Sequence, residues 1–124
     1  MLQESKPDDA CGTAAHALYL AEMLAVFMRN DVDYAMVWHL LEDRTKGSGW
    51  KCGLVEYDGS KLIKTPNFDV FKLIANTMQG RYLTSFISDG NYIVAARNDA
   101  ESAIHVLIIN PHASRQEIAL TIPG

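Results

Sequence analysis

Apolar residues recur with helical spacing in the first stretch of the chain. The stripe consists of Ala14, Leu18, Ala21, Ala25 and Met28. Such a period is typical of a helix with one buried face. Thr13 is a suitable N-cap, and Asn30 with Asp31 marks the end of the pattern. We therefore predict a largely buried helix that begins after Thr13.

A nearly continuous apolar run follows from Val32 to Leu41, interrupted by Asp33 and His39. The run does not alternate between apolar and polar residues. Strands of a parallel sheet that is covered on both faces show this pattern. The sequence thus predicts a helix, a short turn and a buried strand.

Local signals after residue 49 predict a hairpin and a second helix. Asp58-Gly59 separates two β-prone runs, so a hairpin is expected from Gly53 to Ile63. Thr65 and Pro66 then match the N-cap and the first position of a helix. Its predicted buried stripe is Phe68, Phe71, Ile74, Ala75 and Met78.

Beyond Gly80 the chain is β-prone. The predicted strands are Tyr82 to Ile87, Tyr92 to Arg97, Ala103 to Asn110 and Gln116 to Ile122. Short strands at regular spacing favour an antiparallel sandwich. We expect two parts, residues 1–43 and residues 44–124.

The order of these elements resembles the C-terminal third of clan-A glycoside hydrolases, with the α-L-arabinofuranosidase and β-xylosidase-like families closest. Three parts of the sequence carry the resemblance: Ala14 to Trp38, Lys64 to Leu73, and the pair Tyr92 to Ala96 with Val106 to Asn110. The resemblance implies an α+β fold. It would contain the last helix and strand of a (β/α)8 barrel, followed by a partial antiparallel β-sandwich.

The same resemblance implies a retaining glycoside hydrolase that acts on arabinofuranosides or xylosides. A whole barrel needs roughly 250 residues, and this chain has 124. The two catalytic Glu of such enzymes would lie upstream of the Ala14 helix. Glu4 lacks the expected neighbours and is interpreted as a loop carboxylate. We therefore expect a C-terminal fragment with no catalytic residue and no activity alone.

Substrate contacts are expected where the predicted barrel strand ends, because barrel active sites lie at that end. Trp38 and His39 are the candidates for substrate binding. The alternative for Trp38 is packing in the barrel core, and the alternative for His39 is a hydrogen-bonded structural role. Glu42 and Asp43 are interpreted as a solvated loop. Carbohydrate would thus be the partner, through the parent enzyme.

A rival hypothesis is a stand-alone carbohydrate-binding or interaction module that uses Trp38, Trp50 and Tyr57. A purely structural domain is a third alternative. We also expect open strand edges to be covered by further contacts or in a homo-oligomer.

Charge and motifs argue against several classes of partner and cofactor. The net charge is −4 and the basic residues are scattered, so no nucleic-acid partner is expected. No apolar run approaches the ~20 residues of a membrane span, so no membrane partner is expected. Nucleotide-binding and Ser-hydrolase motifs are absent, and no cofactor is predicted. The sequence leaves localisation open.

The cysteines and histidines show no metal-binding spacing. Cys11 and Cys52 are interpreted as two plain thiols. A disulfide between them is the alternative, and it would need close approach and an oxidising compartment, neither of which the sequence shows. His16, His105 and His112 lie in separate predicted elements. No metal site is therefore expected.

Overall fold

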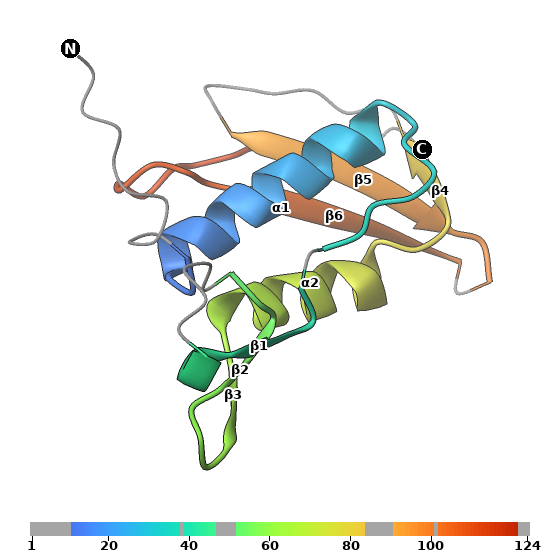
Figure 1. Cartoon of the computed structure of the whole chain (residues 1–124). Helices are drawn as coiled ribbons and strands as arrows, with labels where there is room; N and C mark the ends of the chain where they lie inside the picture. Colours follow the sequence, from blue (N-terminus) through green and yellow to red (C-terminus); the bar gives the residue numbers. More distant parts are fainter. Residues whose placement is uncertain (1–10, 38, 47–51, 84–90, 101, 122–124) are drawn as a thin grey trace.

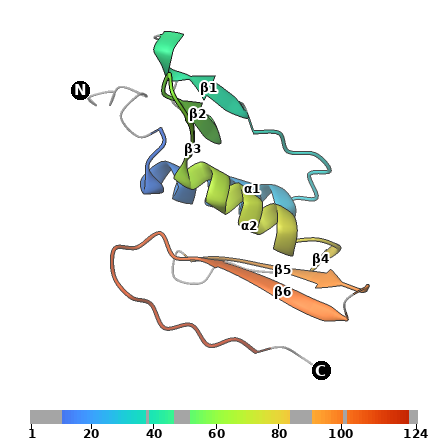
Figure 2. The ribbon, with the colours of Figure 1, turned by 90° about the horizontal axis from the view of Figure 1, so that it is seen from below.

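The computed structural model describes residues 11–37, 39–46, 52–83, 91–100 and 102–121. Within these residues the chain forms two helices and two three-stranded sheets, shown in Figure 1. The helices lie between the two sheets, as Figure 2 shows. Neither of the described helices is long and apolar enough to span a membrane.

Helix α1 (Ala14–Arg29) confirms the predicted first helix. Thr13 is its N-cap, and the Thr13 hydroxyl accepts the backbone N–H of His16 at 3.3 Å. At the other end, Asn30 Nδ2 donates to the carbonyl of Val26 at 2.8 Å. Asp31 then takes a positive φ of 52°, which turns the chain away from the helix axis.

Helix α2 (Pro66–Thr77) begins where the sequence predicted. Thr65 occupies the N-cap position, but its hydroxyl makes no capping hydrogen bond. The hydroxyl instead lies against the carbonyl oxygens of Gly53 and Leu54, at 2.9 and 3.0 Å. Thr65 thus attaches the start of α2 to the segment that leads into the first sheet.

The first sheet has the strand order β1-β2-β3. Strand β1 (Leu41–Asp43) pairs in parallel with β2 (Val55–Tyr57), and β2 pairs antiparallel with β3 (Leu62–Lys64). A short 3-10 helix, η2 (Arg44–Lys46), follows β1. The antiparallel pair confirms the predicted hairpin.

The second sheet has the order β4-β5-β6, and both pairs are antiparallel. Its strands are β4 (Arg81–Leu83), β5 (Tyr92–Asn98) and β6 (Ala103–Ile109). The core lies between this sheet and the helices. Its buried apolar members are Leu20, Ala21, Leu24, Ala25, Met28, Leu54, Ile74, Met78, Val94, Ala96 and Ile109.

The predicted buried strand from Val32 to Leu41 is wrong. Residues 31–36 are exposed, and strand β1 begins only at Leu41. A parallel strand of this kind is buried when both faces of its sheet are covered, whereas β1 is an edge strand of a short sheet in the described part of the chain. The described residues form no closed barrel, so a barrel helix and strand is not the architecture of this chain.

The partial sandwich is wrong as well. Residues 116–121, expected to contribute a fourth strand, are not in a strand, and helices rather than a second sheet cover the β4-β5-β6 sheet (Figure 2). The fold is a small α+β arrangement with separate sheets. The division into residues 1–43 and 44–124 stays a prediction.

The expectation of two plain thiols is wrong too. Cys11 and Cys52 form a disulfide, with their Cα atoms 4.6 Å apart. It joins the segment before α1 to the segment before β2. Proximity of this kind depends on the tertiary fold, which the spacing of two cysteines in a sequence does not reveal.

Candidate functional site

The two residues predicted to bind substrate are described to different extents. Trp38 lies outside the described residues. His39 is half-buried, and its backbone carbonyl accepts the N–H of Leu54 at 3.1 Å. This hydrogen bond continues the β1–β2 pairing into the residues that precede the two strands. Substrate binding by Trp38 and His39 stays a prediction.

Two glutamates lie side by side in the β1–β2 pair. Glu42 and Glu56 are register partners in parallel strands, and their side chains are therefore on the same face. Glu42 is 5% exposed and Glu56 is 7% exposed. The interpretation of Glu42 as part of a solvated loop is therefore wrong.

Both buried carboxylates have partners within the fold. Glu42 Oε2 accepts the backbone N–H of Gly53 at 3.3 Å. Glu56 Oε2 lies 3.1 Å from Nη1 of Arg44. Buried carboxylates normally carry such compensation. These contacts connect β1, η2 and the start of β2. They explain how two carboxylates can be buried side by side without a functional role.

Asp43 has a local role at the end of β1. Its Oδ1 accepts the hydroxyl of Thr45 at 2.6 Å and the backbone N–H of Thr45 at 3.0 Å. These two hydrogen bonds, followed by the nearby Lys46 ammonium, lower the pKa of the Asp43 carboxyl. The carboxylate thus stabilises the turn into η2.

An exposed row of apolar side chains runs from the end of α1 to the start of β1. We call it the apolar strip, and it consists of Val32, Tyr34, Met36, Leu40 and Leu41. Tyr34 is 90% exposed and Met36 is 96% exposed. Exposed apolar side chains that are close in the sequence can mark an interaction site where they share one surface patch.

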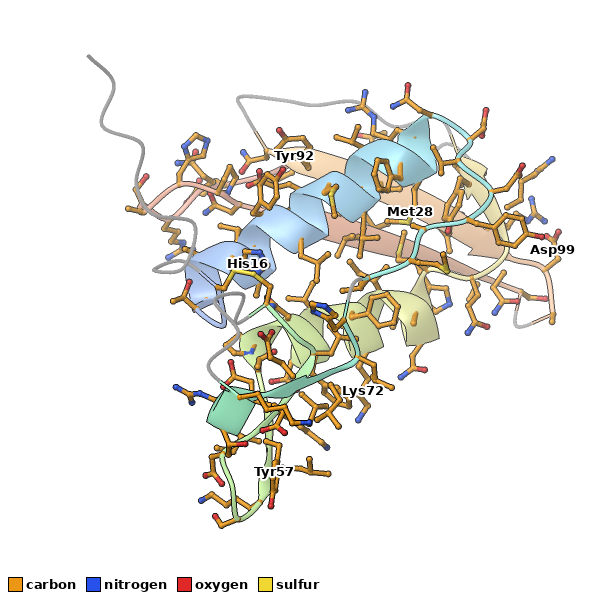
Figure 3. The ribbon with its side chains drawn as sticks, viewed as in Figure 1. His16, Met28, Tyr57, Lys72, Tyr92 and Asp99 are labelled. Atoms are coloured by element: carbon orange, nitrogen blue, oxygen red, sulfur yellow. A yellow bond between two sulfur atoms is a disulfide. The ribbon has the colours of Figure 1, made fainter. Side chains whose placement is uncertain are left out.

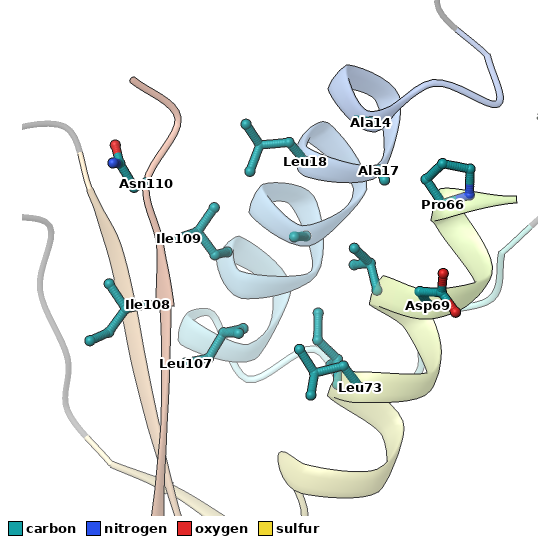
Figure 4. Close-up of a pocket in the computed structure, with 13 residues that line it drawn as sticks. Ala14, Ala17, Leu18, Pro66, Asp69, Leu73, Leu107, Ile108, Ile109 and Asn110 are labelled. Atoms are coloured by element: carbon teal, nitrogen blue, oxygen red, sulfur yellow. The ribbon is translucent and has the colours of Figure 1, made fainter. Parts of the chain in front are cut away.

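An apolar groove of about 370 Å³ opens between α1, α2 and β6. Figure 4 shows Leu18 of α1, Leu73 of α2 and Ile109 of β6 around it. None of the described residues that line the groove is aromatic, and Asp69 is the one charged residue among them. The groove therefore offers dispersion contacts and few hydrogen-bonding groups.

The chemistry of the groove suits apolar polypeptide side chains better than sugar. Sugar sites need several polar groups to match the hydroxyls, usually beside an aromatic ring. The groove lining lacks that combination in the described part of the chain. An apolar side chain from another polypeptide would need only shape and burial.

Of the other two aromatic residues in the rival hypothesis, Trp50 and Tyr57, the structure describes only Tyr57. Trp50 lies outside the described residues, as does Glu4. Tyr57 is half-buried, and its hydroxyl donates to the carbonyl of Gly59 at 2.8 Å. This bond lies within the hairpin, at the position labelled Tyr57 in Figure 3. A sugar contact by Tyr57 or Trp50 stays a prediction.

Comparison with known proteins finds no protein family, no curated protein and no solved structure that matches this chain.

Proposed function

We propose that this chain is a non-catalytic docking part of a glycoside hydrolase that acts on arabinofuranosides or xylosides. The observation that carries the proposal is the apolar strip. Tyr34 and Met36 are almost fully exposed, and burying two such side chains would contribute about 1.5–3 kcal/mol each. A contact with the part of the enzyme that performs the chemistry would supply that burial.

Two elements lie where segments of the resemblance placed a helix and strands, although the barrel and the sandwich that it implied are not found in the described residues. Thr65 and Pro66 begin α2, at the start of one of the segments that carries the resemblance. Tyr92–Ala96 and Val106–Ile109 lie in β5 and β6, the strands expected from the same resemblance.

The test compares this 124-residue chain with the full product of the natural reading frame that contains it. Both proteins are treated with hydrogen peroxide, and the oxidation rate of each methionine is measured by mass spectrometry. Met28 and Met78 are buried, so they serve as internal controls. We expect Met36 to oxidise rapidly in this chain and at least about tenfold more slowly in the full product, since solvent exposure governs methionine oxidation.

The full product should also cleave an aryl arabinofuranoside or xyloside, and this chain should not. A natural reading frame without a glycosidase part would overturn the proposal. So would equal oxidation of Met36 in both proteins, or saturable hydrolysis by this chain that disappears when Glu4 is changed. A change of tryptophan fluorescence on adding oligosaccharide to this chain would instead favour a stand-alone carbohydrate-binding module.

A further inference from the structure

The disulfide lies beside a histidine that is held in one orientation. The Sγ atoms of Cys11 and Cys52 and a ring nitrogen of His16 lie within 4.8 Å of one another. Figure 3 shows the labelled His16 next to the yellow bond of the disulfide. All three residues are half-buried. The cluster is formed by the loop before α1, the first turn of α1 and the segment before β2.

Asn67, in the first turn of α2, orients the ring of His16 through a hydrogen bond. Asn67 is 1% exposed. Its Nδ2 donates to the carbonyl of Cys52 at 3.4 Å, which leaves Oδ1 as the acceptor for His16 Nδ1 at 3.0 Å. His16 Nδ1 is therefore the donor of this hydrogen bond, which leaves Nε2 as the ring nitrogen for a metal.

His16 and Asn67 are arranged like a metal-binding histidine and the residue that orients it by a hydrogen bond. Histidines that bind metals usually donate their other ring N–H to a carbonyl or carboxylate oxygen. A tetrahedral zinc centre has arms of roughly 2.0–2.3 Å, so its ligand atoms are about 3.5–3.8 Å apart. A ring nitrogen of His16 lies within 4.8 Å of both sulfurs. The sulfurs are bonded to each other in the oxidised chain, so they would have to move apart on reduction to reach that spacing.

We propose that Cys11, Cys52 and His16 form a zinc site when the disulfide is reduced. This inference does not depend on the proposed function. A thiol or phosphine reductant supplies two electrons, and two protons convert the disulfide into two thiols. Each thiol then releases its proton to solvent as its sulfur binds Zn²⁺. His16 Nε2 is the third ligand and water the fourth, a Cys₂His set that zinc accepts.

The oxidised and reduced chains thus use the same cluster in two ways. In the oxidised chain a covalent bond joins the two segments. In the reduced chain the metal would hold the same segments together, and Asn67 would act as a positioning residue through His16. The site is accordingly open to metal only under reducing conditions.

The test uses the whole chain, reduced with a phosphine in metal-free, oxygen-free buffer and titrated with Co²⁺. We expect one equivalent to produce thiolate-to-cobalt charge-transfer absorption and the visible bands of tetrahedral cobalt. Zn²⁺ should displace the cobalt. The oxidised chain should give no charge-transfer band.

Variants assign the ligands. His16→Ala and Cys52→Ser should each weaken Co²⁺ binding at least about tenfold, whereas the matched control His112→Ala, at an exposed position, should bind like the natural chain. Asn67→Ala should weaken binding by about 10–100-fold, and Asn67→Asp should rescue it, since a carboxylate oxygen can still accept from His16 Nδ1. Circular dichroism of each variant verifies folding.

Three results would overturn the zinc site. The reduced chain could fail to bind Co²⁺ at micromolar concentration. The oxidised chain could bind it equally well, which would place the metal elsewhere. His16→Ala, at a half-buried position where folding is expected to persist, could bind as tightly as His112→Ala.

Discussion

Gly80 packs directly against the backbone of Arg97: a Cβ atom built on Gly80 would overlap the Arg97 carbonyl oxygen. The φ angle of Gly80 is +101°, a conformation that residues with a side chain rarely adopt. Two separate constraints therefore require glycine at the connection between α2 and β4.

The variant Gly80→Ala should lower the free energy of unfolding by at least about 3 kcal/mol, because the strained φ and the clash with an immobile backbone add together. Gly59→Ala is the matched control. Its φ is also +101°, but its Cβ would meet only the Cγ2 of Thr45 at 3.2 Å, so a loss of about 1–2 kcal/mol is expected. Urea unfolding measures both, and equal losses would show that the Arg97 contact contributes nothing.

The carboxyl group of Asp58, in the hairpin turn, should titrate at low pH. The backbone N–H groups of Lys61 and Ser60 and the Ser60 hydroxyl donate to Asp58 Oδ1, at 3.0, 2.9 and 2.8 Å. They lower the pKa of Asp58 from its ordinary value of 3.8 to about 2. Since the folded-state pKa is depressed, the stabilisation is complete above about pH 4 and is lost as the pH falls through about 2.

An NMR titration of the Asp58 carboxyl carbon measures this directly. We expect a midpoint near pH 2, and a midpoint near 3.8 would contradict the three hydrogen bonds. Asp58→Asn keeps an acceptor oxygen in place, so the hairpin should persist in that variant while its pH dependence between 2 and 4 disappears.

The disulfide should contribute substantially to stability. It closes a sequence separation of 41 residues, and cross-links of that length stabilise proteins by about 2–4 kcal/mol. The double variant Cys11→Ser/Cys52→Ser should lose that amount in urea unfolding with a chelator present. Adding a phosphine reductant should produce the same loss in the natural chain and no change in the double variant. An unchanged natural chain after complete reduction would show that the cross-link is energetically neutral.

The apolar strip should cause self-association of this chain. Sedimentation velocity over a range of concentrations should reveal a dimer, and Tyr34→Ser/Met36→Ser should weaken it at least about tenfold. Because both side chains are exposed, the variant's free energy of unfolding should change by less than about 0.5 kcal/mol. Leu62→Thr, at an exposed position in β3 outside the strip, is the control and should leave dimerisation intact. A chain that is monomeric at every concentration would argue against a homo-oligomer.

Local sequence signals predicted the elements whose formation depends on nearby residues. The N-cap Thr13, the Thr65-Pro66 pair and the Asp58-Gly59 turn each act within a few positions, and α1, α2 and the hairpin lie where these residues indicated. The strands β5 and β6 followed from β-prone runs separated by turn residues.

Errors arose where the outcome depends on distant partners. An apolar run such as Val32 to Leu41 can become a buried strand only if neighbouring strands exist, and the run itself does not encode them. The pairing of Glu42 with Glu56 follows from the register of a parallel strand pair. His16 and Asn67 are 51 residues apart, so their contact had no local signal in the sequence.

The two sheets share no strand in the described part of the chain, and the helix layer separates them. A disturbance in one sheet therefore reaches the other through side-chain packing rather than through a continuous backbone hydrogen-bond network. The β1-β2-β3 sheet can consequently open to solvent while β5 and β6 stay paired. Its amide protons would then exchange with solvent faster than those of β5 and β6.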